Sequence, residues 1–473
     1  MKEYDLIVIG SGAGMNVASD AHSQGMNVAV IENGPVGGTC LNRGCIPSKI
    51  MLYPADVVEI IREAGKVGVE ADVKKVDFKL IMKRMHDLVD EDVKGMEKGI
   101  RSAWGKGLDL YNTTGRFVGK KILEVDGKKI KAPRILIAAG SRESVPPVPG
   151  LKETGFITST EVFDLEEPPE ELVIIGGGYI AAEFGHFFDA VGSDVTLVGR
   201  NRYLVPREEP EISKELERRF RERMKVHTGF EVVKAGKKDG KKYVVAKDGK
   251  NGKRYRIKGD ELLLAVGRIS NADLFRPDKT GVETVGKGWI KVDEHLRTNV
   301  EGIYAIGDAT GKNLFRHTAN HEASVAWRNM MAEKDPEVND EHAVPHAVFT
   351  YPQIASVGLR EAEAVEKTVV MVGQSSYTDA VKGYAMGDDG KSLVKVIVDA
   401  RTRKILGAHA IGPHATAMVQ PLVYIMNAGD GTFAPLTKAQ TIHPALEEIM
   451  VRAFGNMRPG KGQEKYFQHE HHH

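Results

Sequence analysis

Two stretches of this 473-residue chain share one pattern, and that repeat restricts the possible fold more than any other feature. DLIVIGSGAGMNVASDAHSQGMNVAVIEN (5–33) and ELVIIGGGYIAAEFGHFFDAVGSDVTLVGR (171–200) each contain a short apolar strand, a glycine-rich turn, a helix-length segment and a second apolar strand. Elements in this order form the βαβ unit that opens a dinucleotide-binding domain. The sequence therefore predicts two Rossmann-like domains in one chain.

Each unit is followed far downstream by another apolar strand that ends in small residues. These strands are ILIAAGSR (135–142) and LLLAVGR (262–268). We interpret this order as a first domain that is interrupted by the second and completed after it. The boundaries we expect are 1–144 together with 270–343 for the first domain, and 145–269 for the second.

A third domain is expected over residues 344–458. SLVKVIVD (392–399) and KILGAHAIG (404–412) are strand-like, and helix-like segments follow them. A chain of this length is also expected to form roughly three domains. The predicted fold class is thus α/β, with two Rossmann-like domains and a C-terminal α+β domain. The Gly- and Lys-rich stretch 234–258 is typical of a solvated β-meander, with a polyanion-binding patch as the alternative.

The last residues, EKYFQHEHHH, resemble an expression tag with a histidine tail. We therefore leave residues 459–473 out of the functional argument, because such tails carry no information about the fold. A native His-rich metal-binding tail is the competing interpretation. We assign no metal site elsewhere in the chain.

The chain has 66 Lys and Arg and 65 Asp and Glu, so its net charge is close to zero. This balance gives no electrostatic reason to expect nucleic acid or an anionic membrane as partner. No segment has the roughly 18 uninterrupted apolar residues typical of a membrane-spanning helix. The N-terminus, MKEYDLIVIG, begins a strand pattern at once and leaves no room for a signal peptide. We expect a cytoplasmic protein.

The first glycine-rich turn has the residue types that a bound pyrophosphate needs. Gly10 and Gly12 allow close backbone approach, while Met15 occupies the third glycine position and Gly14 comes one residue early. The second strand of the unit ends in Glu32, placed to accept hydrogen bonds from a ribose hydroxyl pair. The fingerprint is weak alone and strong in its strand–turn–helix–strand context.

The second turn differs where nucleotide choice is decided. It has Gly176, Gly178 and the small residue Ala181, but Gly199 stands where the first unit has its acid, followed by Arg200 and Arg202. A carboxylate there would repel a 2′-phosphate, whereas an arginine pair attracts one. We expect an NADP(H) site, with NAD(H) possible. Two solvated loop arginines are the alternative.

The chain has only two cysteines, and both lie in GGTCLNRGCIPSK (37–49). Scattered cytosolic cysteines are usually buried free thiols, but a close pair such as Cys40 and Cys45 is more often catalytic than structural. A flavin beside the pair could reduce its disulfide, and a nearby base could hold one thiol as thiolate. Gly44 and Pro47 are expected to interrupt the helix.

This cysteine segment closely resembles the redox-disulfide motif of the class I pyridine nucleotide-disulfide oxidoreductases, and the resemblance extends from residue 1 to about 457. It implies FAD as cofactor. In the family the first cysteine, here Cys40, exchanges with the substrate. The second, here Cys45, faces the flavin as the charge-transfer thiolate. Electrons would pass from nicotinamide through flavin to this pair, and the reverse direction serves dihydrolipoamide oxidation.

Further matches carry over from the same resemblance. YAIGDATG (304–311) is similar to the second FAD motif, in which Asp308 would hydrogen-bond the ribityl chain, and a helix begins near His317. Lys49 and Glu183 match an ion pair near flavin N5, and Tyr179 matches an aromatic lid over the nicotinamide pocket. The remaining cofactor contacts that the resemblance implies are Gly38, Thr39, Ala139, Gly140 and Gly267.

TIHPALEE (441–448) resembles the family's HPxxxE signature. His443 would be the acid/base and Glu448 the carboxylate that orients it. A lone histidine is more often a satisfied surface residue, but the cysteine motif reverses those odds. In the family this histidine reaches the cysteines of the other subunit. The resemblance therefore implies a homodimer with a shared active site.

The cysteine count narrows the choice within the family. Two cysteines exclude members that relay electrons through a second C-terminal pair, and the presence of both argues against single-cysteine members. RISNADL (268–274), ANHEA (319–323) and AVFTYPQIASVG (347–358) most resemble mycothione reductase-like enzymes, which favours an NADPH-dependent reductase of a small disulfide. The alternatives are a dihydrolipoamide dehydrogenase acting on a lipoyl substrate, and a flavoprotein subunit that serves binding or assembly.

Overall fold

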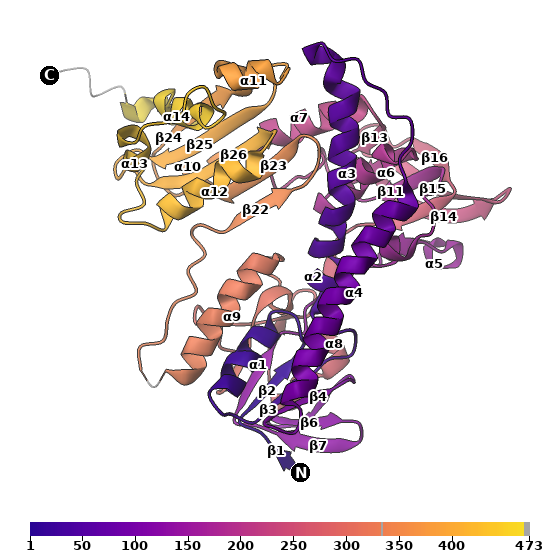
Figure 1. The fold of residues 1–473 in the computed structure, drawn as a ribbon, viewed down its shortest axis with the longest axis vertical. Coiled ribbons are helices and arrows are strands. Elements are labelled where there is room, and N and C mark those ends of the chain that lie inside the picture. Colours follow the sequence, from indigo (N-terminus) through magenta and orange to yellow (C-terminus); the bar gives the residue numbers. More distant parts are fainter. Residues whose placement is uncertain (333, 468–473) are drawn as a thin grey trace.

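The computed structural model describes residues 1–332 and 334–467, and its two parallel sheets follow the repeat in the sequence (Figure 1). Each sheet has five strands, and their apolar runs are buried almost throughout, as expected for parallel strands covered on both faces. The first sheet has the order β21 (Ile303–Ala305), β8 (Arg134–Ile137), β2 (Leu6–Ile9), β3 (Val28–Ile31), β4 (Leu108–Tyr111). The second has the order β10 (Ile157–Thr158), β17 (Glu261–Leu264), β11 (Glu171–Ile175), β12 (Asp194–Gly199), β13 (Lys225–Thr228).

Each parallel sheet is covered by helices on one face and by smaller sheets on the other. Helices α1 (Gly14–Ser23) and α9 (Arg316–Met331) pack together on the first sheet, and α6 (Tyr179–Ala190) packs on the second. The stretch 234–258 lies in an antiparallel meander, which confirms the β-meander interpretation. The meander strands are β14 (Phe230–Lys238), β15 (Lys241–Asp248) and β16 (Arg254–Gly259); the small sheet of the first domain contains β1 (Lys2–Glu3), β7 (Lys128–Lys131), β6 (Ile122–Val125) and β5 (Arg116–Gly119).

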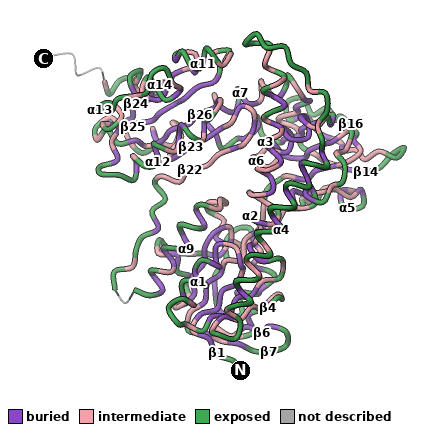
Figure 2. The backbone as a smooth tube through the Cα atoms, viewed as in Figure 1, coloured by how far each residue is buried: buried purple, intermediate pink, exposed green. Residues whose placement is uncertain are grey.

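The C-terminal region forms the expected α+β unit around one antiparallel sheet. Its apolar strand faces pack against helices α12 (Ala415–Met426) and α14 (Glu448–Gly455). The buried residues of the chain gather around the three main sheets (Figure 2). The predicted α/β class is therefore confirmed. The strand order is β22 (Pro345–Val348), β23 (Gln353–Gly358), β26 (Ile405–Gly412), β25 (Leu393–Asp399), β24 (Val370–Ser376), β27 (Arg458–Pro459).

The helices between β3 and β4 of the first sheet also pack against the second repeat. The cysteines lie on α2 (Gly38–Arg43) and at the start of α3 (Cys45–Glu63), and α3 packs against both α6 and the long α4 (Phe78–Ala103). In Figure 1, α4 runs from the first domain to the second. The cysteines are thus placed at the junction of the two repeats.

The region that we set aside as a tag contributes to the fold at its beginning. Strand β27 pairs with β24, and the Gln463 side chain is buried, accepts a hydrogen bond from Val370 N (2.8 Å) and donates to Thr368 O (2.9 Å). Packing of the third domain thus extends to Gln463. Residues 468–473 of the expected tag lie outside the described residues.

Among residues 1–332 and 334–467, no helix is both long enough and apolar enough to cross a membrane.

The glycine-rich turns are fixed by the same close contact in both repeats. Gly10 has φ +101°, and a Cβ there would lie 2.2 Å from the Ala138 carbonyl oxygen. Gly176 has φ +146°, and its Cβ would lie 2.2 Å from the Ala265 carbonyl oxygen. Each turn therefore fits against its neighbouring strand only without a side chain, and both the space and the backbone conformation require glycine.

We expect Gly10→Ala to lower the free energy of unfolding by about 2–5 kcal/mol, since a left-handed alanine costs roughly 1–2 kcal/mol and overpacking roughly 1–3. The matched control is Gly25→Ala, which has φ +81° but no atom within 4 Å of the added Cβ. Urea denaturation followed by circular dichroism measures both. Equal losses would contradict the close approach at Gly10.

Candidate active site

A cavity of about 2230 Å³ lies where the repeats, the cysteines and the third domain meet. Both glycine-rich turns and both cysteines line it, and the third domain contributes residues of β22 and α12. The predicted site residues on its wall are Gly10, Gly12, Glu32, Gly38, Thr39, Cys40, Cys45, Lys49, Ala139, Gly140, Gly176, Gly178, Tyr179, Glu183, Arg200, Gly267, Asp308 and His317.

Five predicted site residues are placed elsewhere, for different reasons. Gly14 begins α1, and a Cβ there would lie 2.7 Å from Val8, so it has the helix-packing role of the third motif glycine. Ala181 is fully buried in α6. The Arg202 guanidinium lies 5.1 Å from the centre of the Tyr203 ring and is not on the cavity wall, whereas Arg207 is. The other two are His443 and Glu448.

The cysteines lie on two helices separated by Gly44. A Cβ at Gly44 would lie 2.9 Å from Thr39 O, so the chain can turn tightly here and place both thiols on the cavity wall. Both thiols are free in this structure. Pro47 does not break the helix as expected, because it lies in the first turn of α3, where proline removes no helical hydrogen bond.

The two thiols differ in their readiness to ionise. A hydrogen bond from Cys45 lowers the pKa of Cys40 to about 7, and the charges of Arg316 and Lys49 act in the same direction against the opposing effect of burial. The same bond, together with burial, raises the pKa of Cys45. Of the two reduced cysteines, Cys40 therefore ionises more readily, which differs from the thiolate that the family resemblance implies at Cys45. Because a thiolate is the nucleophile in disulfide exchange, Cys40 is the better attacking group.

An ion pair joins α3, the helix that begins at Cys45, to α6 of the second repeat. Lys49 Nζ lies 2.8 Å from Glu183 Oε2, and Glu183 Oε1 accepts a hydrogen bond from Phe349 N (2.9 Å) in the third domain. Lys49 also lies 4.7 Å from the centre of the Phe349 ring. The ammonium is thus held beside the cysteines, where it favours negative charge on Cys40.

The residues around the first turn fit an adenosine diphosphate group. Glu32 accepts hydrogen bonds from Ser11 N (2.9 Å), Ser11 Oγ (2.7 Å) and Gly34 N (2.9 Å), which orient its carboxylate toward the cavity. A Cβ at Gly38 would lie 2.9 Å from Gly12 Cα, so the backbones touch and leave room for a ligand. The N-terminal end of α1 faces this space and favours phosphate. Ser11 was not predicted.

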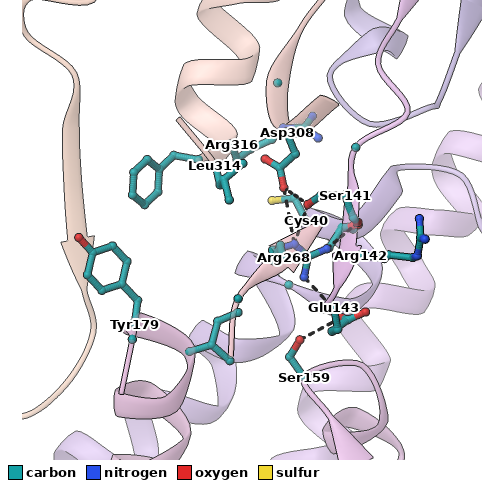
Figure 3. Close-up of a pocket in the computed structure, with 18 of the residues that line it drawn as sticks. Cys40, Ser141, Arg142, Glu143, Ser159, Tyr179, Arg268, Asp308, Leu314 and Arg316 are labelled. Carbon is teal, nitrogen blue, oxygen red and sulfur yellow. Dashed lines mark hydrogen bonds and ion pairs between the residues drawn. The ribbon is translucent and has the colours of Figure 1, made fainter. Parts of the chain in front are cut away.

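A polar network that the sequence did not predict surrounds Asp308 (Figure 3). Asp308 Oδ2 accepts a hydrogen bond from Ser141 Oγ (2.6 Å), and Arg268 donates to both Ser141 Oγ and Ser141 O at 2.6 Å. Arg268 also approaches Glu143 at 3.4 Å. The signal was present in the strand ends ILIAAGSR and LLLAVGR, because β9 (Ser141–Glu143) pairs with β18 (Arg268–Ser270).

Helix α9 begins at Arg316, close to the predicted position. His317 Nε2 donates to Pro345 O (2.7 Å), and burial lowers the pKa of His317, so its ring stays neutral near pH 7. At this end of α9, the positive charge of Arg316 lowers the pKa of Cys40. Figure 3 shows Arg316 near Asp308 and Cys40. This residue was missed because nothing in its sequence neighbourhood distinguishes it from a surface arginine.

The histidine pair forms as the motif implies, but away from the cysteines of its own chain. His443 Nδ1 lies 3.0 Å from Glu448 Oε1, which also accepts from Ala445 N (3.0 Å). The His443 side chain is 71% exposed. Figure 1 places the end of the third domain that carries α13 (Ala434–Lys438) and α14 far from α2. A second copy could therefore reach this histidine.

Comparison with known families agrees with this geometry. The profile described as pyridine nucleotide-disulphide oxidoreductase matches residues 4–328, and that of the dimerisation domain of the same family matches residues 344–454. The chain belongs to the pyridine nucleotide-disulphide oxidoreductase family. It is thus a flavoprotein enzyme that uses FAD with a pyridine nucleotide, and the dimerisation domain suggests a homodimer.

Several relatives align over nearly the whole chain. The mycothione reductase of Mycobacterium tuberculosis is 36% identical over 470 residues, which cover 97% of this chain and 100% of that protein. The dihydrolipoyl dehydrogenase of Chlamydia muridarum is 34% identical over 460 residues, 94% of this chain and 95% of that protein. The HOCl-induced flavoprotein disulfide reductase RclA from Escherichia coli has 26% identity and a TM-score of 0.83, with 96% and 99% of the two chains covered.

In the reduced protein, we expect iodoacetamide to label Cys40 with a pH midpoint of about 7, below the ordinary thiol value of about 8.5. Labelling requires thiolate, so it should rise with pH and level off above that midpoint. Cys45→Ala removes the hydrogen-bond donor and should move the midpoint upward. Peptide mass spectrometry measures both sites. Faster labelling of Cys45 than of Cys40 would contradict the assignment.

Proposed function

We propose that this chain is an NADPH-dependent reductase of a small disulfide. The observation that carries the proposal is that Cys40 and Cys45 line the same cavity as both glycine-rich turns. When bound, FAD supplies two-electron transfer between the nicotinamide and the cysteine pair. The first domain would hold FAD, the second NADP(H), and the third would form the dimer contact.

The chemistry of the protein groups follows from their charges. The Cys40 thiolate attacks one sulfur of the substrate disulfide, forms a mixed disulfide and releases one thiolate, which takes a proton from His443 of the second copy. Cys45, deprotonated by the same histidine, then attacks the Cys40 sulfur. This step forms the Cys40–Cys45 disulfide and releases the second substrate sulfur as a thiolate, which takes from His443 the proton that Cys45 gave up. Lys49 stabilises negative charge beside the pair while Glu183 holds it in place.

The choice of nucleotide depends on one side of the second turn. Gly199 leaves no carboxylate at the end of β12, and Arg200 and Arg207 line the cavity beyond it. A 2′-phosphate is dianionic and gains charge-assisted hydrogen bonds from arginine. The similarity to mycothione reductase supports the same preference and a low-molecular-weight disulfide substrate.

We expect a higher kcat/KM with NADPH than with NADH. Arg200→Ala should reduce that preference about tenfold or more, because a hydrogen bond to a charged group contributes roughly 1.5–3 kcal/mol. Arg202→Ala is the matched control, since this arginine lies on Tyr203, and it should leave the preference unchanged. Steady-state kinetics with both nucleotides measures this, using a panel of low-molecular-weight disulfides and free lipoamide. Equal use of NADH with lipoamide as best substrate would favour a dihydrolipoamide dehydrogenase instead.

His443→Ala should slow the disulfide half-reaction by about 10²–10⁴-fold while leaving reduction by NADPH unchanged, because only thiol exchange needs this acid/base. Stopped-flow absorbance separates the two half-reactions. Co-expression of His443→Ala with Cys40→Ser should restore activity in hybrid dimers, since one shared site would then be intact. A hybrid without activity would mean that histidine and cysteines act within one chain.

A further inference from the structure

The antiparallel meander of the second domain is far more basic than the rest of the chain. Residues 230–259 contain eleven Lys and Arg and only three Asp and Glu, although the whole chain is balanced. The near-zero net charge gave no reason to expect nucleic acid, but a net charge does not show where the charges gather. In Figure 1 the meander projects from the second domain on the side away from the third.

Strand register divides the meander into two faces. Val244 and Ala246 are buried on one face, where they pack against strands of the parallel sheet of the second domain. Side chains alternate along a strand, so the residues next to them point to the opposite face, which we call the outer face. Pairing of Val245 with Lys234 and Arg256 extends the outer face across all three strands. Its exposed cations are Lys234, Lys238, Lys247, Arg254, Arg256 and Lys258.

The protein itself does not neutralise these six cations. None of them forms an ion pair within residues 1–332 and 334–467, whereas Lys241 of β15 pairs with Glu171 (3.2 Å) and Asp260 (2.5 Å). The outward positions of the three strands carry a single acid, Glu231, opposite Lys247. Such a surface attracts a ligand that carries several negative charges.

An uncharged strip lies between the cations of β14 and those of β16. It consists of Gly236, Tyr243 and Val245, and a Cβ at Gly236 would lie 2.6 Å from Tyr243 Oη. The tyrosine ring therefore lies across the neighbouring strand. The Arg256 guanidinium is 4.6 Å from the centre of this ring, which attracts the cation and holds its flat group on the outer face.

The charges along β16 match a chain of phosphates. Arg254, Arg256 and Lys258 are alternate residues of an edge strand, so their side chains follow one another about 7 Å apart. Successive phosphates of an extended single strand have a similar spacing. The bases would then lie over the uncharged strip, where the Arg256 guanidinium offers a surface for stacking. A protein partner fits less well, because specific protein interfaces are depleted of lysine and have an apolar core.

We propose that the outer face of the meander binds single-stranded nucleic acid, with the phosphates along β16 and the bases towards Tyr243. The inference is independent of the proposed reaction, since the outer face contains none of the residues to which that reaction assigns a role. Each phosphate contact releases a counterion from the strand. Three to six such contacts should weaken binding roughly 20-fold to 300-fold between 50 and 200 mM salt.

The test is fluorescence anisotropy of a labelled oligothymidine of about 12 nucleotides, added to the FAD-loaded protein. Excess NADP⁺ and NAD⁺ are present, so that the proposed nucleotide site is occupied. Combining Arg254→Gln, Arg256→Gln and Lys258→Gln should weaken binding about tenfold or more at 50 mM salt and reduce the slope of log K against log salt by about two. Tyr243→Leu should weaken binding about twofold to fivefold with the slope unchanged, because the ring no longer holds Arg256.

The matched control combines Lys120→Gln, Lys128→Gln and Lys129→Gln, which removes the same charge from exposed positions at β6 and β7 of the first domain. It should bind oligothymidine as the unmodified protein does, and both triple variants should keep the reductase activity. An equal loss of binding in the control would reject the outer face as the site. No binding by the unmodified protein at 50 mM salt would also reject the proposal.

Two further probes separate nucleic acid from other polyanions. An oligoglutamate peptide with the same number of charges should bind at least tenfold more weakly than oligothymidine, because it has no bases to stack. Equal or tighter binding of the peptide would replace nucleic acid by an acidic protein segment. Phosphatidylserine vesicles should release the protein when oligothymidine is added. Vesicles that retain it would indicate a membrane surface as the partner instead.

Discussion

The ion pair between Lys49 and Glu183 is the contact on which the arrangement of the site depends. It joins α3 to α6, and Glu183 is in turn fixed by the backbone of Phe349 in the third domain. Cys45 lies one helical turn before Lys49, and Tyr179 lies one turn before Glu183. Because Lys49 and Glu183 are in contact, the residues one turn earlier on the two helices, Cys45 and Tyr179, line the same cavity. Dithiol chemistry and nucleotide binding are thus aligned by a contact between two helices, and a second ion pair between α3 and α6, Arg62–Asp189 (2.9 Å), reinforces it.

Features with strong local patterns could be predicted from the sequence. The repeat of strand, turn, helix and strand gave both parallel sheets, because buried strands and glycine turns are determined by adjacent residues. The cysteine pair, the Lys49–Glu183 contact and the His443–Glu448 contact came from motifs matched to a known family. Gly14 was located, but its packing against Val8 was not foreseen, since the pattern specifies a small residue without saying what it touches.

What could not be predicted depends on contacts between distant segments. Arg268, Ser141 and Asp308 meet only because β9 pairs with β18, and Glu208 meets His346 and Ser356 only because the second repeat packs against the third domain. A sequence pattern cannot show which of two neighbouring arginines faces a cavity, so Arg202 was expected on its wall while Arg207 was missed. Pro47 was misplaced because the start of α3 was not known: in the first turn of a helix, proline removes no helical hydrogen bond and does not interrupt the helix.

The short strand β27 affects how readily the protein pairs with other molecules. It lies at the end of the third sheet and pairs with Met371 and Val372, while Gly460 and Gln463 bond the backbone of Val370. Both residues of β27 protect a sheet edge: Arg458 is charged, and Pro459 has no N–H to donate to a further strand. A chain shortened to residue 457 would leave β24 as an open edge. Its exposed backbone could then pair with another molecule, so residues 458–463 also protect the protein against aggregation.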